Sequence, residues 1–298
     1  MRTVTLKAPA KLNLHLGIYT QLDERRYHKA DSLMVALGLS DEVVVKEADK
    51  SLEQSLDGLP LVQCVPPVDV PPQKNTAYRA AHALAELVGR APNVQITICK
   101  HIPDQAGMGG SSSDAAAVLR ALCELWDLDV QDARVVEAAR MVGADVPFFL
   151  DPVPTLLVGA GDVVQEKFAR FASPIPVALV RPKGPGVSTP VAYAAFDECP
   201  TPPASPDALC STLREGQATP NQIAKHLFNN LDPVACRLLP QVETVKSWLC
   251  QQAGALGVQV TGSGSCVFAV CATNDDAQRI AHSARKSLDA WAYPTHMV

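Results

Sequence analysis

Three features are missing from this sequence, and each absence excludes a class of protein. The chain has no excess of positive charge: 26 Lys and Arg residues stand against 31 Asp and Glu residues, for a formal net charge of -5. This balance argues against nucleic acid or an anionic membrane as the partner, because both require a basic face. No apolar run approaches the length of a membrane span, and the segment after Met1 has no apolar core of signal-peptide length. A local phosphate pocket stays compatible with this charge, since backbone amides and one Lys can build it.

The nine cysteines also lack the spacing of a disulfide framework or a metal site. No Cys-x-x-Cys pair occurs, no paired histidines accompany them, and the count is odd. Cys123 and Cys266 lie in apolar stretches and are typical of small core residues. We therefore expect a reducing compartment: the cytoplasm, or a plastid stroma if a transit peptide has been removed.

Two familiar phosphate-binding signatures are absent as well. The sequence contains no Gly-Lys dipeptide, which excludes a Walker A loop. No Gly-x-Gly-x-x-Gly follows a predicted strand. A phosphate-binding loop in this chain must therefore belong to another class.

What is present indicates a folded protein of mixed class. The chain has 298 residues, of which 47% are apolar and 19% charged, enough for a sizeable core and two domains of ordinary size. Strands and helices interleave, which indicates an α+β or α/β architecture with a boundary near 155–165. A polar, Pro-rich passage occupies 48–75 and a Pro-rich connector 199–206. The periodicity predicts strands at 3–19 (two segments around 8–11), 32–37, 42–46, 94–98, 155–158, 176–181, 258–261 and 266–271, and helices at 76–88, 114–126, 132–142, 205–214, 219–229, 235–252 and 275–289.

The strongest local motif is a small-residue loop at 102–113, between a predicted strand and a predicted helix. Glycines at 107, 109 and 110 let the backbone take positive φ and approach a ligand closely. Serines at 111–113 place hydroxyls and unpaired amides at the helix start, where an anion is favoured. The segment therefore fits a loop that binds phosphate. A Gly-Ser linker before a capped helix is the alternative, and the Ala-rich helix directly behind the loop argues against it.

Three further segments are weaker, and each has a purely structural alternative. Lys11 and Asn13 share one face of the first strand, where they hold a substrate hydroxyl or form a solvent-facing polar edge. Asp145 precedes an apolar run, as a carboxylate that accepts a hydroxyl proton or as an N-cap. The small-residue loop within 260–268 is a hairpin turn if it has no other role.

In this order, the segments resemble the GHMP kinase superfamily. Its three motifs are an N-terminal strand segment, a Pro-x-x-x-Gly-Leu-Gly-Ser-Ser-like loop and a late Gly-rich loop. Finer features resemble the members of that superfamily that act on 4-diphosphocytidyl-2-C-methyl-D-erythritol. The matching segments span nearly the whole chain: 8–14, 27–28, 102–117, 143–148, 184–190, 230–234 and 262–266.

The resemblance implies an α+β fold of two domains. An N-terminal ATP-binding domain at 1–160 is expected to be similar to ribosomal protein S5 domain 2, and a C-terminal substrate domain at 161–298 to be a ferredoxin-like α/β sandwich. The implied reaction is ATP-dependent phosphorylation of the substrate's 2-hydroxyl in non-mevalonate isoprenoid biosynthesis. ATP and Mg²⁺ are the implied cofactors, with the metal held mainly through ATP and no residue assigned as its ligand. The implied partner is this small molecule, with the chain as a monomer or homodimer.

The resemblance also implies a role for individual residues. Asp145 matches the group that takes the hydroxyl proton, and Lys11 matches the residue that orients it and offsets developing charge. Tyr27, His28 and Tyr193 match positions that hold the cytosine, two rings stacking and the imidazole reading the edge of the base. The remaining matches are a substrate contact at Asn13, the late Gly-rich loop at Gly262, Ser263 and Gly264, and the ATP-binding residues Asn75, Pro103, Asp104, Gln105, Ala106, Gly107, Met108, Gly109, Gly110, Ser111, Ser112 and Ser113.

The sequence departs from the family pattern at a few positions. Arg26 stands where the family usually has Gly before its Tyr-His pair. If that position needs positive φ, Arg26 costs about 1 kcal/mol of strain; otherwise the loop is reshaped. Met108 replaces a common Leu, Ser111 a common Gly, and Thr76 the Leu that usually follows the adenine-site Asn. None of these changes removes a catalytic group.

Two alternatives to the cytidyl-substrate kinase stay open. One is another GHMP small-molecule kinase, of the homoserine or mevalonate type, and the other is a non-catalytic binding protein with the same fold. The Tyr27-His28 pair and the Gly-Val-Ser-Thr-Pro segment at 186–190 favour the cytidyl substrate. Retention of Lys11, Asp145 and the glycine loop argues against a non-catalytic protein.

Overall fold

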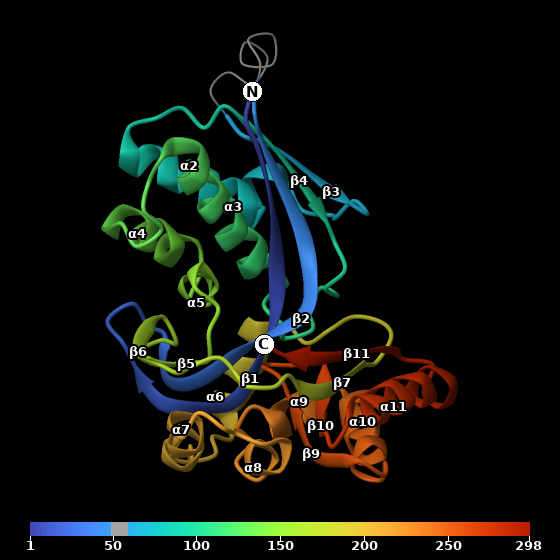
Figure 1. Ribbon diagram of the computed structural model, residues 1–298. Coiled ribbons are helices and arrows are strands. Elements are labelled where there is room, and N and C mark those ends of the chain that lie inside the picture. Colours follow the sequence, from blue (N-terminus) through green and yellow to red (C-terminus); the bar gives the residue numbers. More distant parts are fainter. Residues whose placement is uncertain (49–58) are drawn as a thin grey trace. The chain divides into compact units, whose positions relative to one another are not determined.

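The computed structural model describes residues 1–48 and 59–298, which form two compact units (Figure 1). The chain passes between the units within its first two strands, β1 (Thr3–Leu22) and β2 (His28–Glu47). The units are therefore not consecutive halves of the sequence, and the domains predicted at 1–160 and 161–298 stay a prediction. Unit 1 consists of Met1–Ala10, Leu39–Pro103 and Gly109–Pro152, and unit 2 of Lys11–Gly38, Asp104–Met108 and Val153–Val298.

Unit 1 is a sheet with helices on one side (Figure 1). The first part of β1 and the last part of β2 join β3 (Leu61–Val65) and β4 (Val94–Cys99). β4 pairs antiparallel with β2 and parallel with β3. A short 3-10 turn, η1 (Pro72–Lys74), precedes the helices, which are α2 (Thr76–Val88), α3 (Gly110–Trp126), α4 (Ala133–Val142) and α5 (Val146–Leu150).

The local sequence explains where α2 begins and ends and why it packs closely on α3. The Asn75 side chain accepts a hydrogen bond from the Ala77 amide at the start of α2, and Gly89 ends that helix with a φ of 67°. Small alanines make up most of the buried face of α2, and α3 buries four more, so the two backbones can approach each other closely. The start of α3 is thereby held against a packed neighbour.

The carboxy-terminal part of unit 2 is a four-stranded antiparallel sheet in the order β9-β10-β7-β11. In sequence, α10 (Pro240–Cys250) lies between β7 and β9, and α11 (Asn274–Ser287) between β10 and β11. This order of strands and helices is the ferredoxin-like split βαβ arrangement, as predicted. The strands are β7 (Ile175–Arg181), β9 (Ala255–Val260), β10 (Val267–Cys271) and β11 (Trp291–Met297).

One apolar cluster fixes both helices to the same face of this sheet. Val245 and Leu249 of α10 and Ile280 of α11 are buried in a single cluster with side chains of all four strands. Apolar residues recur on each helix at the three- and four-residue spacing of an amphipathic face. Burial of these faces supplies the main favourable term for this part of the fold.

The rest of unit 2 surrounds the later part of β1 and the earlier part of β2. β8 (Phe228–Asn229) pairs parallel with β1, so that His15 lies beside Phe228 and Leu16 beside Asn229. β5 pairs antiparallel with both β2 and β6. The remaining elements are β5 (Thr155–Val158), β6 (Val163–Lys167), α6 (Thr189–Glu198), α7 (Asp207–Arg214), α8 (Pro220–Ala224) and α9 (Asp232–Leu238).

Several predicted elements are confirmed and others are wrong. The helix at 76–88 and the strand at 155–158 have the predicted bounds. β1 and β2 each run unbroken through positions where two shorter strands are predicted, because their side chains stay paired and buried across the polar residues. The predicted helix at 235–252 is two helices, since Pro240 begins the second one.

Other elements escape prediction for identifiable reasons. β3 lies within the Pro-rich passage, where no periodicity marks it, and β11 contains Pro294, which reads as a strand breaker. β11 tolerates this proline because it borders the four-stranded sheet, pairing with β2 only at Met297. Five further elements are not predicted: η1, α5, β6, α6 and β8. The predicted helix at 219–229 ends at Ala224, and the one predicted at 114–126 begins at Gly110.

Candidate functional site

Lys11 and Asn13 form a buried polar pair on β1 in unit 2. Their exposed fractions are 4% and 2%, and the Lys11 ammonium donates to Asn13 Oδ1 at 2.5 Å. The Asn13 amide nitrogen donates in turn to Ser32 Oγ at 2.9 Å. The solvent-facing polar edge that was the structural alternative is therefore wrong. The buried Lys11 ammonium therefore places a positive charge in the interior of this unit.

The late Gly-rich loop packs on the first part of the phosphate-binding loop, within the same unit. Three backbone carbonyls of the phosphate loop accept hydrogen bonds from this late loop: Gln105 from the Ser265 amide, Ala106 from the Cys266 amide, and Gly107 from the Thr261 hydroxyl. The Met108 carbonyl accepts from the Lys11 amide at 3.0 Å. Backbone contacts thus tie the predicted phosphate loop to both the late loop and the catalytic candidate Lys11.

Glycine is required at two contact points of these loops. Gly107 has a φ of 72°, and a Cβ there would lie 2.1 Å from the Thr261 carbonyl oxygen. Gly262 has a φ of 57°, and a Cβ there would lie 3.1 Å from the Gly107 oxygen and 3.5 Å from the Lys11 ammonium nitrogen. A side chain at Gly107 would separate the two backbones, and one at Gly262 would be crowded and would strain a positive φ. The late loop does join two antiparallel strands, β9 and β10, but it is more than a turn because it contacts the predicted site.

The neighbouring residues of the two loops are placed as follows. Ser263 Oγ lies 3.1 Å from Thr189 Oγ1, and the Gly264 amide donates to the Thr261 carbonyl. Gln105 has a φ of 51°, and its side-chain oxygen accepts from the Gly186 amide at 3.2 Å. The family-like segment at 184–190 therefore also reaches the phosphate loop in unit 2.

The second part of the phosphate loop, in unit 1, is the start of α3. Gly109 stands at the N-cap with a φ of 70° and supplies no side-chain cap, so the first amides of a 17-residue helix have no side-chain acceptor there. Ser113 is 1% exposed, and its hydroxyl oxygen has no hydrogen-bond partner in the described part of the chain. Unpaired amides and an unsatisfied buried hydroxyl at a helix start are the donors that a phosphate requires.

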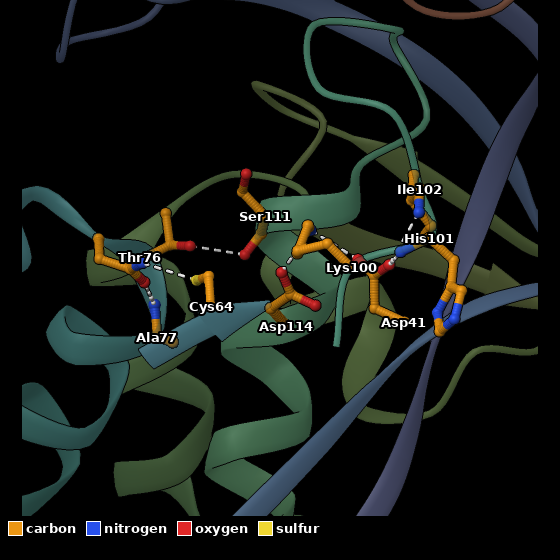
Figure 2. A network of polar contacts seen from close by, with 10 residues as sticks. Asp41, Cys64, Thr76, Ala77, Lys100, His101, Ile102, Ser111 and Asp114 are labelled. Carbon is orange, nitrogen blue, oxygen red and sulfur yellow. Dashed lines mark hydrogen bonds and ion pairs between the residues drawn. The ribbon is translucent and has the colours of Figure 1, made fainter. Parts of the chain in front are cut away.

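A buried ion-pair network lies beneath this helix start (Figure 2). The Lys100 ammonium donates to Asp41 Oδ2 at 2.6 Å and to Asp114 Oδ2 at 2.7 Å. Asp41 Oδ1 accepts from the backbone amides of His101 and Ile102. One lysine and one aspartate therefore bind the chain entering the phosphate loop to the first turn of α3.

Burial and the attraction between Lys100 and the carboxylates shift the pKa values in this network in opposite directions. Burial raises the pKa of Asp114 to about 7, although Lys100 opposes the rise, and Asp41 adds to it. Burial acts to lower the pKa of Lys100, but the carboxylates of Asp114 and Asp41 outweigh it and raise that pKa. Asp114 Oδ1 is buried and has no hydrogen-bond partner among the described residues. Lys100 therefore stays charged and holds two carboxylates that repel each other.

Thr76 connects the start of α2 with the start of α3 (Figure 2). Asn75 caps α2 through its side-chain oxygen, and its amide nitrogen lies 3.8 Å from Cys64 Sγ on β3. Thr76 Oγ1 donates to the Ser111 carbonyl at 2.7 Å. The departure from the usual Leu at position 76 thus provides a polar tie between two predicted nucleotide-site segments.

Asp145 stands directly before α5 in unit 1 and is partly buried. Its backbone is helical, with φ -79° and ψ -15°, and its side chain makes no capping hydrogen bond. Asp145 thus holds the predicted N-cap position but does not cap the helix through its side chain.

The predicted cytosine-binding residues lie in unit 2, and two of them contact each other. The His28 and Tyr193 rings have centroids 5.4 Å apart. His28 Nδ1 lies 2.8 Å from the Tyr19 carbonyl oxygen and Nε2 lies 3.3 Å from Asp197 Oδ1, so acceptors face both ring nitrogens. The Tyr27 ring is 61% exposed, beneath the Arg25 guanidinium at 5.4 Å. An exposed aromatic ring is free to stack on a base.

Arg26 adopts the left-handed backbone that the family's glycine suggests. Its φ is 68°, in a tight loop where its amide donates to the Asp23 carbonyl and the Tyr27 amide donates to Asp23 Oδ1. This positive φ agrees with the hypothesis of strain at Arg26.

Several residues of the site escape sequence reasoning. Lys100, Thr261 and Asn229 are polar residues between strands or at their ends, and Asp41 is a polar residue within β2. Only their long-range contacts distinguish them. A usable signal exists for Lys100 alone, since it ends a predicted strand directly before the glycine loop.

Within residues 1–48 and 59–298, no group of three or more His, Cys, Asp or Glu side chains is placed to hold a metal ion. No helix in the described part of the chain is both long and apolar enough to cross a membrane. The prediction that Mg²⁺ is held mainly through ATP stays a prediction.

Comparison with known proteins supports the resemblance seen in the sequence. The families described as GHMP kinases N terminal domain and GHMP kinases C terminal match residues 75–151 and 212–290. A 4-diphosphocytidyl-2-C-methyl-D-erythritol kinase from Pelotomaculum thermopropionicum is 34% identical over 287 residues, covering 95% of this chain and 94% of that protein. The chain belongs to this kinase family. The GHMP α+β fold and the prediction of an ATP-dependent small-molecule kinase are thereby confirmed.

Solved structures agree with this membership. A crystal structure of 4-(cytidine 5'-diphospho)-2C-methyl-D-erythritol kinase superposes on this kinase with a TM-score of 0.77 and 30% identity, over 99% of each chain. A homoserine kinase from Cytophaga hutchinsonii gives a TM-score of 0.71 at 19% identity, over 100% of this chain and 95% of that one. The second likeness shows a shared fold alone.

Proposed function

We propose that this kinase transfers the γ-phosphoryl group of ATP to the 2-hydroxyl of 4-diphosphocytidyl-2-C-methyl-D-erythritol, giving the 2-phosphate and ADP, in non-mevalonate isoprenoid biosynthesis. Relatives that carry this substrate's name, alike over nearly the full length, support the choice over the homoserine and mevalonate alternatives. The observation that carries the proposal is the buried Lys11–Asn13 pair between the two glycine loops. Nine free cysteines support the cytoplasm as its location.

The phosphate loop fits the triphosphate of ATP. Gly107 allows the close backbone approach, while the uncapped start of α3 and the unpartnered Ser113 hydroxyl offer donors to anionic oxygens. Asn75 and Thr76, at the start of α2, belong to the adenine end of the proposed site. ATP supplies the phosphoryl group, and Mg²⁺ bound to its phosphates offsets their charge.

The proposed chemistry assigns one proton transfer to the chain. Asp145 accepts the proton of the substrate's 2-hydroxyl as that oxygen attacks phosphorus. Lys11 supplies a fixed positive charge where negative charge develops, and Asn13 holds the ammonium in place through Oδ1. Burial of the Lys11–Asn13 pair keeps water from screening this charge.

The proposed cytosine site explains why a cytidyl group is recognised. Tyr193 and His28 provide adjoining rings, and Tyr27 adds an exposed aromatic face. A flat base gains from stacking on such faces, and an imidazole supplies a directional hydrogen bond to its edge.

Turnover of purified protein tests the substrate directly. ATP and Mg²⁺ are supplied with the cytidyl substrate, homoserine or mevalonate in turn, and ADP release is followed together with the mass of the product. We expect turnover with the cytidyl substrate alone. Absence of turnover in a preparation that still binds ATP would refute the assignment, and turnover of homoserine or mevalonate would favour the alternative kinase.

The role of Asp145 is tested by Asp145→Asn. We expect turnover to be abolished and ATP binding to be retained, because the amide keeps the size of the side chain but cannot take a proton. Asp127→Asn is the matched control: Asp127 is exposed at the opposite end of α3 and should leave turnover unchanged. Comparable activity of Asp145→Asn and the control would reject Asp145 as the base.

The stacking role of Tyr27 is tested by Tyr27→Ala. Loss of the ring should raise KM for the cytidyl substrate by about 10-fold and leave KM for ATP nearly unchanged, since a base-stacking contact contributes on the order of 1 to 3 kcal/mol. Tyr293→Ala removes another exposed ring, on β11, and is the control. Equal effects on both KM values would mean that the stacking assignment is misplaced.

A further inference from the structure

Residues 228–230 contact both β1 and the late Gly-rich loop. None of the proposed catalytic, ATP-binding or substrate-binding roles includes this segment. Its backbone is fixed to β1: Leu16 pairs with Asn229 in parallel register, and the Asn230 amide donates to the Leu16 carbonyl at 3.2 Å. The Asn229 side chain points away from these contacts toward β9. Because β1 also carries Lys11 and Asn13, this segment stands beside the strand of the proposed site.

The Asn229 side chain holds the late loop at two backbone points. It is 4% exposed, and its amide nitrogen donates to the carbonyls of Val260 and Gly262, both at 2.8 Å. Its oxygen accepts from the Leu231 amide at 2.9 Å. Both amide hydrogens and the oxygen are therefore used, and the two acceptors flank Thr261. A primary amide is the only neutral side chain that donates twice and accepts in one plane.

The loop that Asn229 holds reaches the reacting groups. Thr261, between the two acceptors, donates to the Gly107 carbonyl and shares contacts with Asn13. The Cβ position of Gly262 is 3.5 Å from the Lys11 ammonium and 3.1 Å from the Gly107 oxygen. The backbone of Gly262 therefore lies close to both Lys11 and the phosphate loop.

We infer that Asn229 is a positioning residue for phosphoryl transfer, which acts by holding Thr261 and Gly262 against Lys11 and the phosphate loop. The inference rests on the proposed function, because it assigns Asn229 to the same site. It also predicts that Asn229 and its neighbour Asn230 differ in their effect on the reaction. Asn230 is equally buried, but its side chain bonds to the Ile18 backbone and the Thr201 carbonyl, which belong to no loop of the site.

Asn229→Asp and Asn230→Asp form a matched pair of variants. Each replaces an amide by a carboxylate of the same shape, loses two donated hydrogen bonds of 2.8 to 2.9 Å and keeps the oxygen that accepts from a backbone amide. Both should lower the melting temperature, since each leaves two buried carbonyls without a donor. Asn229→Asp should also lower kcat by about 10-fold to 100-fold and weaken MgADP binding, because small misplacements at a reacting centre have effects of that size. Asn230→Asp should leave both quantities within about 2-fold of wild type.

The measurements separate this inference from the proposed function. If the wild-type chain does not phosphorylate the cytidyl substrate, the proposed function fails. The positioning role can still be tested in that case, because calorimetry compares the MgADP affinity of the two variants. Weaker MgADP binding in Asn229→Asp alone supports the positioning role. Equal loss in both variants, or none in either, overturns it. If the carboxylates prevent folding, Asn229→Ala and Asn230→Ala remove the same donors without charge, and the same comparison decides.

Discussion

His15 should make the free energy of unfolding depend on pH between about 6.5 and about 4. The imidazole lies on β1, is 1% exposed and stacks on Phe228 with ring centroids 5.2 Å apart. Its Nε2 has no hydrogen-bond partner within the described residues. Burial lowers the pKa of His15 from 6.5 to about 4, although Asp31 acts to raise it. The folded protein therefore keeps this ring neutral where the unfolded chain would protonate it.

Proton linkage gives the sign and the size of this effect of pH on the free energy of unfolding. Between the unfolded pKa and the lower folded pKa, the unfolded state binds a proton that the folded state does not, so the free energy of unfolding decreases as pH falls. For the two pKa values of His15, the loss is about 2 kcal/mol at about pH 5 and about 3 kcal/mol at about pH 4, relative to neutral pH. The loss would be a large share of the stability of an ordinary domain.

Urea unfolding of the wild type and of His15→Phe at several pH values measures this loss. Phe keeps the stacking on Phe228 and cannot be protonated, and His15→Leu serves if the larger ring does not fit. Trp248 and Trp291 lie in the same unit as His15, so their fluorescence reports its unfolding. All other titrating groups are shared, and the difference between wild type and variant isolates His15. Parallel pH profiles in the two proteins would refute the argument.

Two further predictions concern the strained turn and the buried ion pairs. Arg26→Gly should stabilise the protein by about 0.5 to 1 kcal/mol, because glycine adopts a φ near 68° without strain. Thermal unfolding measures this gain. The control, Glu24→Gly in the same turn, should instead destabilise the protein. Lys100→Met should destabilise by about 3 to 5 kcal/mol in urea, because it leaves the buried carboxylates of Asp41 and Asp114 without a cation. Lys183→Met, which breaks an exposed pair with Asp289, should have no measurable effect, and an equal loss in both variants would contradict the reasoning.

Local sequence patterns were enough to predict several structural features of the candidate site. The alternation of a strand places Lys11 and Asn13 on one face, and the structure brings their side chains together. Asn75 before an apolar helical pattern predicts a helix start, which the structure confirms with a side-chain cap. The glycines and serines at 107–113 predict a helix start with free amides, although the helix begins at Gly110, four residues before the predicted position.

Longer-range features could not be predicted in this way. Whether Lys11 is buried depends on the late loop and on β2, which pack over it from distant parts of the chain. The structural alternative for Lys11 was therefore decided by packing and not by local pattern. β11 likewise becomes a strand through its pairing with β7, despite a proline within it.

The sequence by itself determined the family, the order of the motifs and the residue types that phosphoryl transfer requires, since these depend on chemistry that is local to each segment. Only the tertiary structure decided which buried polar groups satisfy one another. Lys100 meets Asp41 across 59 positions, and Asn229 meets Gly262 across 33. A buried charge or amide must find a partner, but the chain topology selects which one, and no local pattern of residues contains that information.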